Sequence, residues 1–243
     1  MPNGSILTHQ NNNIEPQEAQ ARTEPFASRT KLRKLFALGV DLLFPPRCAG
    51  CGRVDTDWCS RCQREIDHTP YIIDVIALEP LAALAATGAH IGKLRQAVHA
   101  LKYENTPKLA VPLGERLAAH LTLLEWPIDT VISVPLHTSR RQQRGYNQSH
   151  LLSEIVASIV DKPCWPDAIE RQRDTRPQVG LNRQQRQANM ANAFTAHSHI
   201  GGHTALLIDD VYTTGATLSG CAAALLSAGA SAVYGLTVTA AND

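Results

Sequence analysis

The segment that most constrains the fold is a short apolar run followed by two carboxylates, a loop of hydroxyl residues and glycine, and an alanine-rich stretch. Its sequence is Leu206-Leu207-Ile208-Asp209-Asp210-Val211-Tyr212-Thr213-Thr214-Gly215-Ala216-Thr217. An uninterrupted apolar run of this length is typical of a strand buried on both faces, so residues 206–208 predict a parallel strand. Residues 217–228 predict a helix directly afterwards. We therefore expect an α/β fold with a mostly parallel sheet flanked by helices.

The turn between this strand and this helix is suited to a phosphate. In open α/β sheets ligands collect at the carboxyl ends of strands, and a helix amino terminus offers unpaired N–H groups to an anion. Residues 213–217, which we call the threonine loop, add hydroxyl donors, and Gly215 lets the backbone approach a phosphate closely. Asp209 and Asp210, which we call the acidic pair, suit sugar hydroxyls or a hydrated Mg²⁺. The alternative is a turn with two solvated aspartates and a capping threonine.

This segment resembles the phosphoribosyl pyrophosphate (PRPP) signature of type I phosphoribosyltransferases, in which two acidic residues precede a threonine- and glycine-rich loop. The resemblance implies that Asp209 and Asp210 hold the ribose hydroxyls. It also implies that the 5′-phosphate is cradled by Thr213, Thr214, Gly215, Ala216 and Thr217. In that family the loop after an earlier strand binds pyrophosphate, which implies the same task for the backbone of residues 135–139.

Four cysteines form a second motif, nearer the amino terminus. They occur as Cys48-Ala49-Gly50-Cys51 and Cys59-Ser60-Arg61-Cys62, two CxxC pairs separated by seven residues. We call residues 45–68 the Cys module. Four thiolates at this spacing suit one tetrahedral Zn²⁺, and a closed shell of four cysteines predicts a structural rather than a catalytic metal. Metal is favoured over disulfides in a cytosolic protein, while redox-active pairs and an iron–sulfur site stay open as alternatives.

Hydrophobic periodicity outlines the rest of the domain. We expect a small sheet from residues 71–76 and 84–87, helices over 91–102, 109–124 and 149–159, and a buried strand over 129–134. Pro135 stops that strand, so the loop over 135–144 leaves another strand end, on the same sheet edge as Asp209. Lys102 and Tyr103, at the end of a helix before a polar loop, are additional candidates for the site.

Two further runs narrow the resemblance to the ComF family, including the gluconate-operon-associated homologue GntX. In that family an amino-terminal zinc module precedes a phosphoribosyltransferase-like domain with an R-G-[FY]-N-Q element and an R-x-T-x-x-Q-x-x-L segment. Here these read Arg144 to Gln148 and Arg173 to Leu181. The resemblance spans about residues 40 to 240, and it implies a role in competence, that is, in the uptake or use of DNA.

Arginines gather around both runs. The clusters are Arg140, Arg141 and Arg144, and then Arg171, Arg173, Arg176, Arg183 and Arg186. Such arginines can neutralise charge as pyrophosphate departs, and residues 173–189 can form a flap that excludes water. We expect Arg144 to act in catalysis with the acidic pair. The expected pyrophosphate and flap residues are Arg140, Arg141, Arg173 and Gln178. A solvated basic face is the alternative, and Tyr146, Gln178 and Asn189 can equally make hydrogen bonds within loops.

Length and composition permit one α/β domain plus a small module. The chain has 243 residues, 44% of them hydrophobic, and a net charge of +1, which gives no global nucleic-acid signal. We expect a disordered tail over 1–30, a basic amphipathic helix and the Cys module over 31–68, and a phosphoribosyltransferase-like domain over 69–243. The helix is too short and too charged to span a bilayer, and no signal-peptide pattern precedes it. We therefore expect a cytoplasmic protein.

Functions from different classes stay open. One is an enzyme, a pentosyl-group glycosyltransferase that transfers phosphoribose from PRPP, with Mg²⁺, to a nitrogen nucleophile. The other is a noncatalytic module on the same fold that senses PRPP or handles single-stranded DNA. For the latter, resemblance to ComF implies a DNA-translocating helicase at the cytoplasmic face of the inner membrane as a partner. The sequence names neither the acceptor nor the oligomeric state.

DNA recognition by the Cys module is a third interpretation. It rests on Arg47, Arg53, Arg61 and Arg64. Strand-independent binding of nucleic acid also calls for interleaved aromatic side chains, and Trp58 alone could stack on a base. The sequence therefore favours a stabilising or protein-docking role for the Cys module.

Overall fold

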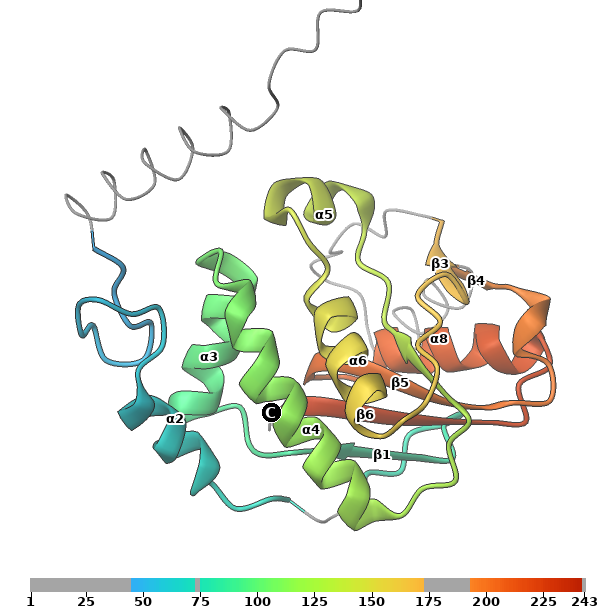
Figure 1. Cartoon of the computed structure of the whole chain (residues 1–243). Helices are drawn as coiled ribbons and strands as arrows, with labels where there is room; N and C mark the ends of the chain where they lie inside the picture. The colour runs from blue at the N-terminus through green and yellow to red at the C-terminus, as the bar shows by residue number, and fades with distance from the viewer. Residues whose placement is uncertain (1–44, 73–74, 173–192, 242–243) are drawn as a thin grey trace, which may run out of the picture. The chain divides into compact units, whose positions relative to one another are not determined.

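A four-stranded parallel sheet forms the centre of the domain (Figure 1). The computed structural model describes residues 45–72, 75–172 and 193–241. The strands of this sheet are β1 (Ala83–Ala86), β6 (Ala232–Ala240), β5 (Thr204–Tyr212) and β2 (Thr130–Ser133), in that spatial order. Two short strands, β3 (Ile169–Arg171) and β4 (Phe194–Ala196), form a separate antiparallel pair. The α/β prediction with a parallel sheet is thus confirmed.

Helices connect the strands and cover both faces of the sheet (Figure 1). Those in the described ranges are α2 (Ser60–Asp67), α3 (Gly92–Tyr103), α4 (Ala110–Leu124), α5 (Thr138–Arg144), α6 (Gln148–Ile159) and α8 (Ala216–Ser227). Two 3₁₀ turns, η1 (Pro107–Leu109) and η2 (Ser198–Ile200), lie between them. None of the helices in the described ranges has both the length and the apolar character that crossing a bilayer requires.

Strand β5 shows how the two apolar cores arise. Its side chains alternate between the faces of the sheet, as in any strand. Leu206 and Ile208 pack with α3, α4 and α6, whereas Ala205 and Leu207 pack with α8 and the β3–β4 pair. All four of these side chains are fully buried. The apolar part of β5 therefore lies between two layers, and the two carboxylates follow toward its carboxyl end.

The register brings the ends of β2 and β5 to the same edge of the sheet. Ser133, the last residue of β2, lies opposite Ile208 of β5, and the next N–H, from Val134, donates to the Ile208 carbonyl at 3.0 Å. Because the strands are parallel, the loop after β2 and the acidic pair therefore lie side by side. This agrees with the expectation that both belong to one sheet edge.

Several elements differ from the expectations. Strand β5 continues through Tyr212, which pairs with Ala240, so the acidic pair lies inside the strand rather than in the turn. Residues 83–86 form β1 of the main sheet rather than part of a small separate sheet, because they pair in parallel with β6. Part of the expected loop over 135–144 is helix α5, no residue of which is buried. The expected tail, amphipathic helix and flap lie outside the described residues.

The Cys module is joined to the domain by one arginine of α4. Arg116 is 5% exposed, and its guanidinium donates to the carbonyls of Ile66, Thr69 and Thr87 at 2.8–3.0 Å. It also lies 4.3 Å from the centre of the Tyr71 ring. Ile66 itself packs in the core beside α3 and α4. The segment that leaves the Cys module is therefore fixed to the α/β domain by both polar and apolar contacts.

Candidate functional site

Side chains from two helices, α6 and α3, contact the acidic pair. Asp209 is half-buried, and its Oδ1 accepts hydrogen bonds from the Ser149 hydroxyl at 2.8 Å and from the Asp210 N–H at 2.9 Å. Asp210 is only 3% exposed, and its Oδ1 lies 2.7 Å from the ammonium nitrogen of Lys102 on α3. The two carboxyl groups thus have fixed and different surroundings.

One oxygen of the acidic pair is left without a partner. The Oδ2 atom of Asp210 is buried and makes no hydrogen bond with any described residue. Buried carboxylate oxygens are normally paired, because an unpaired one loses the hydrogen bonds that water would give it. A hydroxyl or a metal-bound water that reached this oxygen would supply the missing donor.

Electrostatics acts strongly on Asp209. Burial and the neighbouring charge of Asp210 raise the pKa of Asp209 from 3.8 to about 7, against the opposing effects of Lys102 and the Ser149 hydroxyl. Two carboxylates with one lysine leave an excess of negative charge when both are ionised. The pair therefore favours a ligand that brings hydroxyl donors or a cation.

The threonine loop follows directly and opens to solvent. Thr213 and Thr214 are exposed, whereas Gly215 is buried with φ +76°. A Cβ at Gly215 would lie 2.5 Å from a methyl carbon of Leu78, so this position needs glycine for both its backbone angle and its packing. Helix α8 begins at Ala216, and Thr217 is half-buried in its first turn. The loop thus offers backbone N–H groups and hydroxyls at the carboxyl end of β5.

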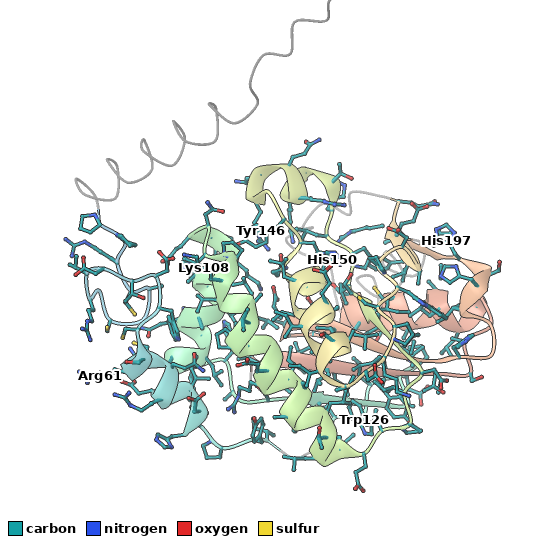
Figure 2. All side chains as sticks on the ribbon, viewed as in Figure 1. Arg61, Lys108, Trp126, Tyr146, His150 and His197 are labelled. Atoms are coloured by element: carbon teal, nitrogen blue, oxygen red, sulfur yellow. The ribbon has the colours of Figure 1, made fainter. Side chains whose placement is uncertain are left out.

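The R-G-[FY]-N-Q motif, residues 144–148, connects the start of α6 to α3. Arg144 donates to the side-chain carbonyl of Gln148, and its guanidinium carbon lies 5.2 Å from the centre of the Tyr103 ring. The Tyr146 hydroxyl donates to the carbonyl of Leu101 on α3, and Figure 2 shows Tyr146 between α3 and α6. Tyr146 thus makes a hydrogen bond within the fold, and it also lines the cavity described below.

Asn147 continues this element into α6. Its amide oxygen accepts from the Ser149 N–H at 3.1 Å, as an N-cap does, and its amide nitrogen donates to the Val134 carbonyl at 3.1 Å. Ser149 then reaches Asp209. Our sequence interpretation missed Ser149, and the signal available was its place two residues after a capping asparagine at a helix start. The element therefore connects the ends of α3, β2 and β5.

A cavity of about 560 Å³ lies beside the loop after β2. The expected pyrophosphate loop lines it through Pro135, Leu136 and Thr138, and α5 contributes Arg141. The remaining walls come from Ser133, from residues 145–147 before α6, from His150 and Leu151 in α6, and from residues between 166 and 171 before and in β3. His150 is visible at this position in Figure 2. The acidic pair is not among the lining residues, so the cavity is a neighbouring compartment rather than the acidic pair's own surroundings.

The expected arginines are distributed unevenly. Arg140 and Arg141 are exposed on α5; of these two, Arg141 lines the cavity, as does Arg171 of the second cluster. Arg144 is half-buried and turned to Tyr103 and Gln148. Arg173 and Gln178 lie outside the described residues.

The four cysteines of the Cys module come together as a cluster. The sulfurs of Cys48, Cys51, Cys59 and Cys62 all lie within 4.8 Å of one another; the Cys51–Cys59 distance is 3.6 Å and the Cys48–Cys62 distance is 3.7 Å. These distances exceed a disulfide bond, about 2.05 Å. They match the roughly 3.8 Å edge of a tetrahedron with metal–sulfur bonds of about 2.3 Å. The four cysteines can therefore hold a metal ion.

The surroundings of the cluster fit this donor set. A hydrogen bond from the Cys62 backbone lowers the pKa of the Cys59 thiol to about 6, and burial raises the pKa of the Cys62 thiol. A Cβ at Gly50 would lie 2.7 Å from the Cys62 sulfur and 2.8 Å from the Trp58 ring, so the first CxxC turn must contain glycine there. Several buried thiolates this close together need a cation to offset their charge.

Comparison with known sequences identifies relatives over most of the chain. No protein-family model matches it. DNA utilization protein YhgH of Escherichia coli K12 is 30% identical over 194 residues, covering 76% of this chain and 85% of the relative. Competence protein F of Haemophilus influenzae is 29% identical over 185 residues, covering 71% and 80%. Competence protein ComFC of Bacillus subtilis is 33% identical over 102 residues, covering 42% and 40%.

Solved structures give more distant matches. The B. subtilis glutamine PRPP amidotransferase, complexed with ADP and GMP, matches with a TM-score of 0.39 and 16% identity, over 55% of this chain and 26% of that one. A Trypanosoma cruzi hypoxanthine phosphoribosyl transferase matches with a TM-score of 0.33 and 15% identity, over 55% and 64%.

Proposed function

The chain belongs to the ComF family, with DNA utilization protein YhgH and competence protein F among its relatives, and we propose that it binds PRPP or a related sugar phosphate. In this proposal Asp209 and Asp210 hold the ribose hydroxyls, and the threonine loop with the start of α8 holds the 5′-phosphate. The observation that carries it is the buried Oδ2 of Asp210, which has no hydrogen-bond partner among the described residues and belongs to the strand that leads into an open, hydroxyl-bearing loop.

The chemistry of the ligand fits these surroundings. A ribose hydroxyl is a neutral donor, so it can satisfy the Asp210 oxygen without adding negative charge to a site that already holds two carboxyls and one lysine. The phosphate then meets backbone N–H groups at the start of α8 rather than the acidic pair. Mg²⁺ bound to the pyrophosphate of PRPP would neutralise the charge of that group.

Isothermal titration of PRPP with Mg²⁺ tests the assignment. The doubly substituted variant Asp209→Asn, Asp210→Asn keeps the shape of both side chains but removes their charge, and we expect it to lose at least about tenfold in affinity. Asp129→Asn is the matched control, since Asp129 is exposed and accepts from the Thr204 N–H at the other end of β5. Equal affinity in all three proteins would remove the acidic pair from the site.

Transfer of phosphoribose is the second candidate function. The cavity beside the loop after β2 favours it, because about 560 Å³ leaves room for an acceptor next to the sugar-phosphate site. Arg141 lines this cavity and can offset charge on departing pyrophosphate. Arg144 would act in catalysis together with the acidic pair. Release of pyrophosphate with a nitrogen nucleophile would establish turnover. Binding of PRPP without release across a panel of acceptors would assign a noncatalytic module.

For the Cys module we propose a structural Zn²⁺ held by Cys48, Cys51, Cys59 and Cys62. A closed shell of four thiolates supplies no open position for a substrate. Metal analysis of the purified protein is expected to give one zinc per chain, and the double variant Cys48→Ser, Cys62→Ser is expected to lose it. Iron with visible absorbance, or a disulfide without metal, would contradict this assignment.

The relatives' names lead us to propose a role in the use or uptake of DNA. The resemblance to ComF, rather than these names, leads us to propose the cytoplasmic face of the inner membrane as its place. Single-stranded DNA and a DNA-translocating helicase are the proposed partners. Binding of labelled single-stranded DNA should weaken with salt if phosphate contacts carry it. If the Cys module carries them, charge reversal of Arg61 and Arg64, both exposed on α2, would abolish binding. Loss of binding on Asp210→Asn instead would assign DNA to the sugar-phosphate site.

A further inference from the structure

We propose that Lys102 is the positioning residue of the acidic pair, fixing the Asp210 carboxylate so that its second oxygen faces the ligand. The inference rests on the sugar-phosphate function proposed above and deepens it. Lys102 lies on α3, outside the strand, loop and helix that carry the motif. The site is thereby completed by a residue more than a hundred positions earlier in the chain.

The contact between Lys102 and Asp210 has the geometry of a strong, shielded ion pair. The ammonium nitrogen is 2.7 Å from Asp210 Oδ1, with the two side chains 20% and 5% exposed. At this burial a charge-assisted hydrogen bond is far less screened than on the surface. It occupies one carboxylate oxygen and leaves the other, Oδ2, as an acceptor with no partner in the described part of the chain. The pair therefore decides which oxygen of Asp210 is available.

Helix α3 is held at both ends, so Lys102 has little freedom to move away. At its start the Lys93 ammonium donates to the carbonyl of Gly50 in the Cys module. At its end the Leu101 carbonyl accepts from Tyr146, and the Tyr103 ring lies under the Arg144 guanidinium. Leu101 itself is fully buried. A lysine on a helix fixed in this way acts as part of the scaffold rather than as a mobile surface charge.

Lys102 is the main counter-charge of the acidic pair, because the other described titratable groups nearby are neutral. From the β1 side His90 hydrogen-bonds to Thr239, and burial together with the charge of Lys102 lowers the pKa of His90, which favours its neutral form. From α8 the buried thiol of Cys221 has its pKa raised by burial and by Asp209, so it stays neutral too. From α6 the contact is the uncharged Ser149 hydroxyl. Among the described residues, Lys102 alone forms an ion pair with either carboxylate.

A double-mutant cycle with PRPP and Mg²⁺ tests the proposal. Lys102→Met removes the charge and keeps most of the side-chain volume, and we expect it to weaken binding roughly tenfold. If Lys102 acts through Asp210, the double variant Lys102→Met, Asp210→Asn binds no more weakly than Asp210→Asn alone.

Thermal unfolding of the same proteins checks the ion pair between Lys102 and Asp210 without ligand. Lys102→Met is expected to lower the melting temperature, and adding Asp210→Asn is expected to recover part of the loss.

Lys108→Met is the matched control. Lys108, labelled in Figure 2, follows the same helix and pairs with Asp57 at 3.4 Å, but its side chain is 85% exposed. We expect its PRPP affinity to stay within about twofold of wild type. Wild-type affinity in Lys102→Met, or additive losses in the double variant, would overturn the positioning role alone. Absence of PRPP binding by the wild type would overturn the proposed function, and the inference with it.

Discussion

At the scale of single residues, this chain carries its clearest constraints where the backbone turns from β5 into α8. Gly215 combines a left-handed backbone angle with a contact that allows no Cβ. Asp209 combines burial with a neighbouring carboxyl, which raises its pKa. Both features lower the free energy of unfolding, and both lie in the motif that we assign to the sugar phosphate. Local strain kept at one place in a fold is a common mark of a functional site.

Gly215→Ala is expected to destabilise the protein by about 2–3 kcal/mol, because it adds a steric contact with Leu78 to the strain of a positive φ. Gly202→Ala is the control, since Gly202 has φ +78° and no atom within 4 Å of an added Cβ. It should cost only about 1 kcal/mol. Urea denaturation measures both. Equal losses would mean that Leu78 yields without cost.

Asp209 makes stability depend on pH. Its pKa is about 7 in the folded protein and near 3.8 when exposed, so folding takes up a proton between these values. The free energy of unfolding should therefore fall as the pH rises from about 4 to about 7. Asp209→Asn removes this contribution and should flatten that dependence. Urea denaturation at pH values across the range checks it, and an unchanged slope in the variant would contradict it.

At the scale of elements, a mostly parallel sheet and the ends of the long helices could be predicted, because apolar runs and periodicity report burial directly. Helix α5 could not, since its sequence TSRRQQR has no apolar stripe and none of its residues is buried. The length of β5 was underestimated for a related reason. Its last four residues include two carboxylates and a tyrosine, and pairing with β6 rather than composition keeps them in the sheet.

The candidate site divides in the same way. The acidic pair, the threonine loop and the cysteines are local in sequence, and their motifs could be identified. Ser149 was missed, and Lys102 was expected only as an additional candidate. Their contacts with the acidic pair come from distant elements, so the packing of α6 and α3 against the sheet reveals them. Arg144 was expected as a catalytic residue, and its contacts with Gln148 and Tyr103 depend on the same packing.

Tyr146→Phe tests whether the connection between α6 and α3 is structural. It deletes the hydrogen bond to the Leu101 carbonyl and should cost about 1 kcal/mol in the free energy of unfolding. PRPP affinity should change by less than about twofold, because the hydroxyl faces α3 rather than the threonine loop. Tyr103→Phe, at a ring that is 67% exposed, is the control with an expected change below about 0.5 kcal/mol. A large loss of affinity with unchanged stability would make Tyr146 a ligand contact.

At the scale of the whole described unit, the Cys module and the α/β domain share one core. Ile66 is buried with side chains of α3 and α4, and Trp58 packs against both the cysteine cluster and that core. The exposed pair of Lys108 with Asp57 adds a contact of lesser strength. Folding of the two parts is therefore expected to be cooperative rather than sequential.

Removal of the metal should destabilise the α/β domain as well as the Cys module. With a strong chelator, we expect a single unfolding transition at a lower temperature, because loss of the cysteine cluster frees Trp58 and the start of α3. Calorimetry with and without chelator measures this, and restored zinc should reverse it. Two separate transitions, with the upper one unchanged, would show that the parts fold independently.

The five hydrogen bonds of Arg116 have a consequence for protein engineering. A chimaera that transplants residues 45–70 onto a foreign host would leave the carbonyls of Ile66, Thr69 and Pro70 without their donor. A chimaera whose boundary lies in the connecting segment therefore loses these contacts, and a transplanted segment has to include α4 as well as the cysteines.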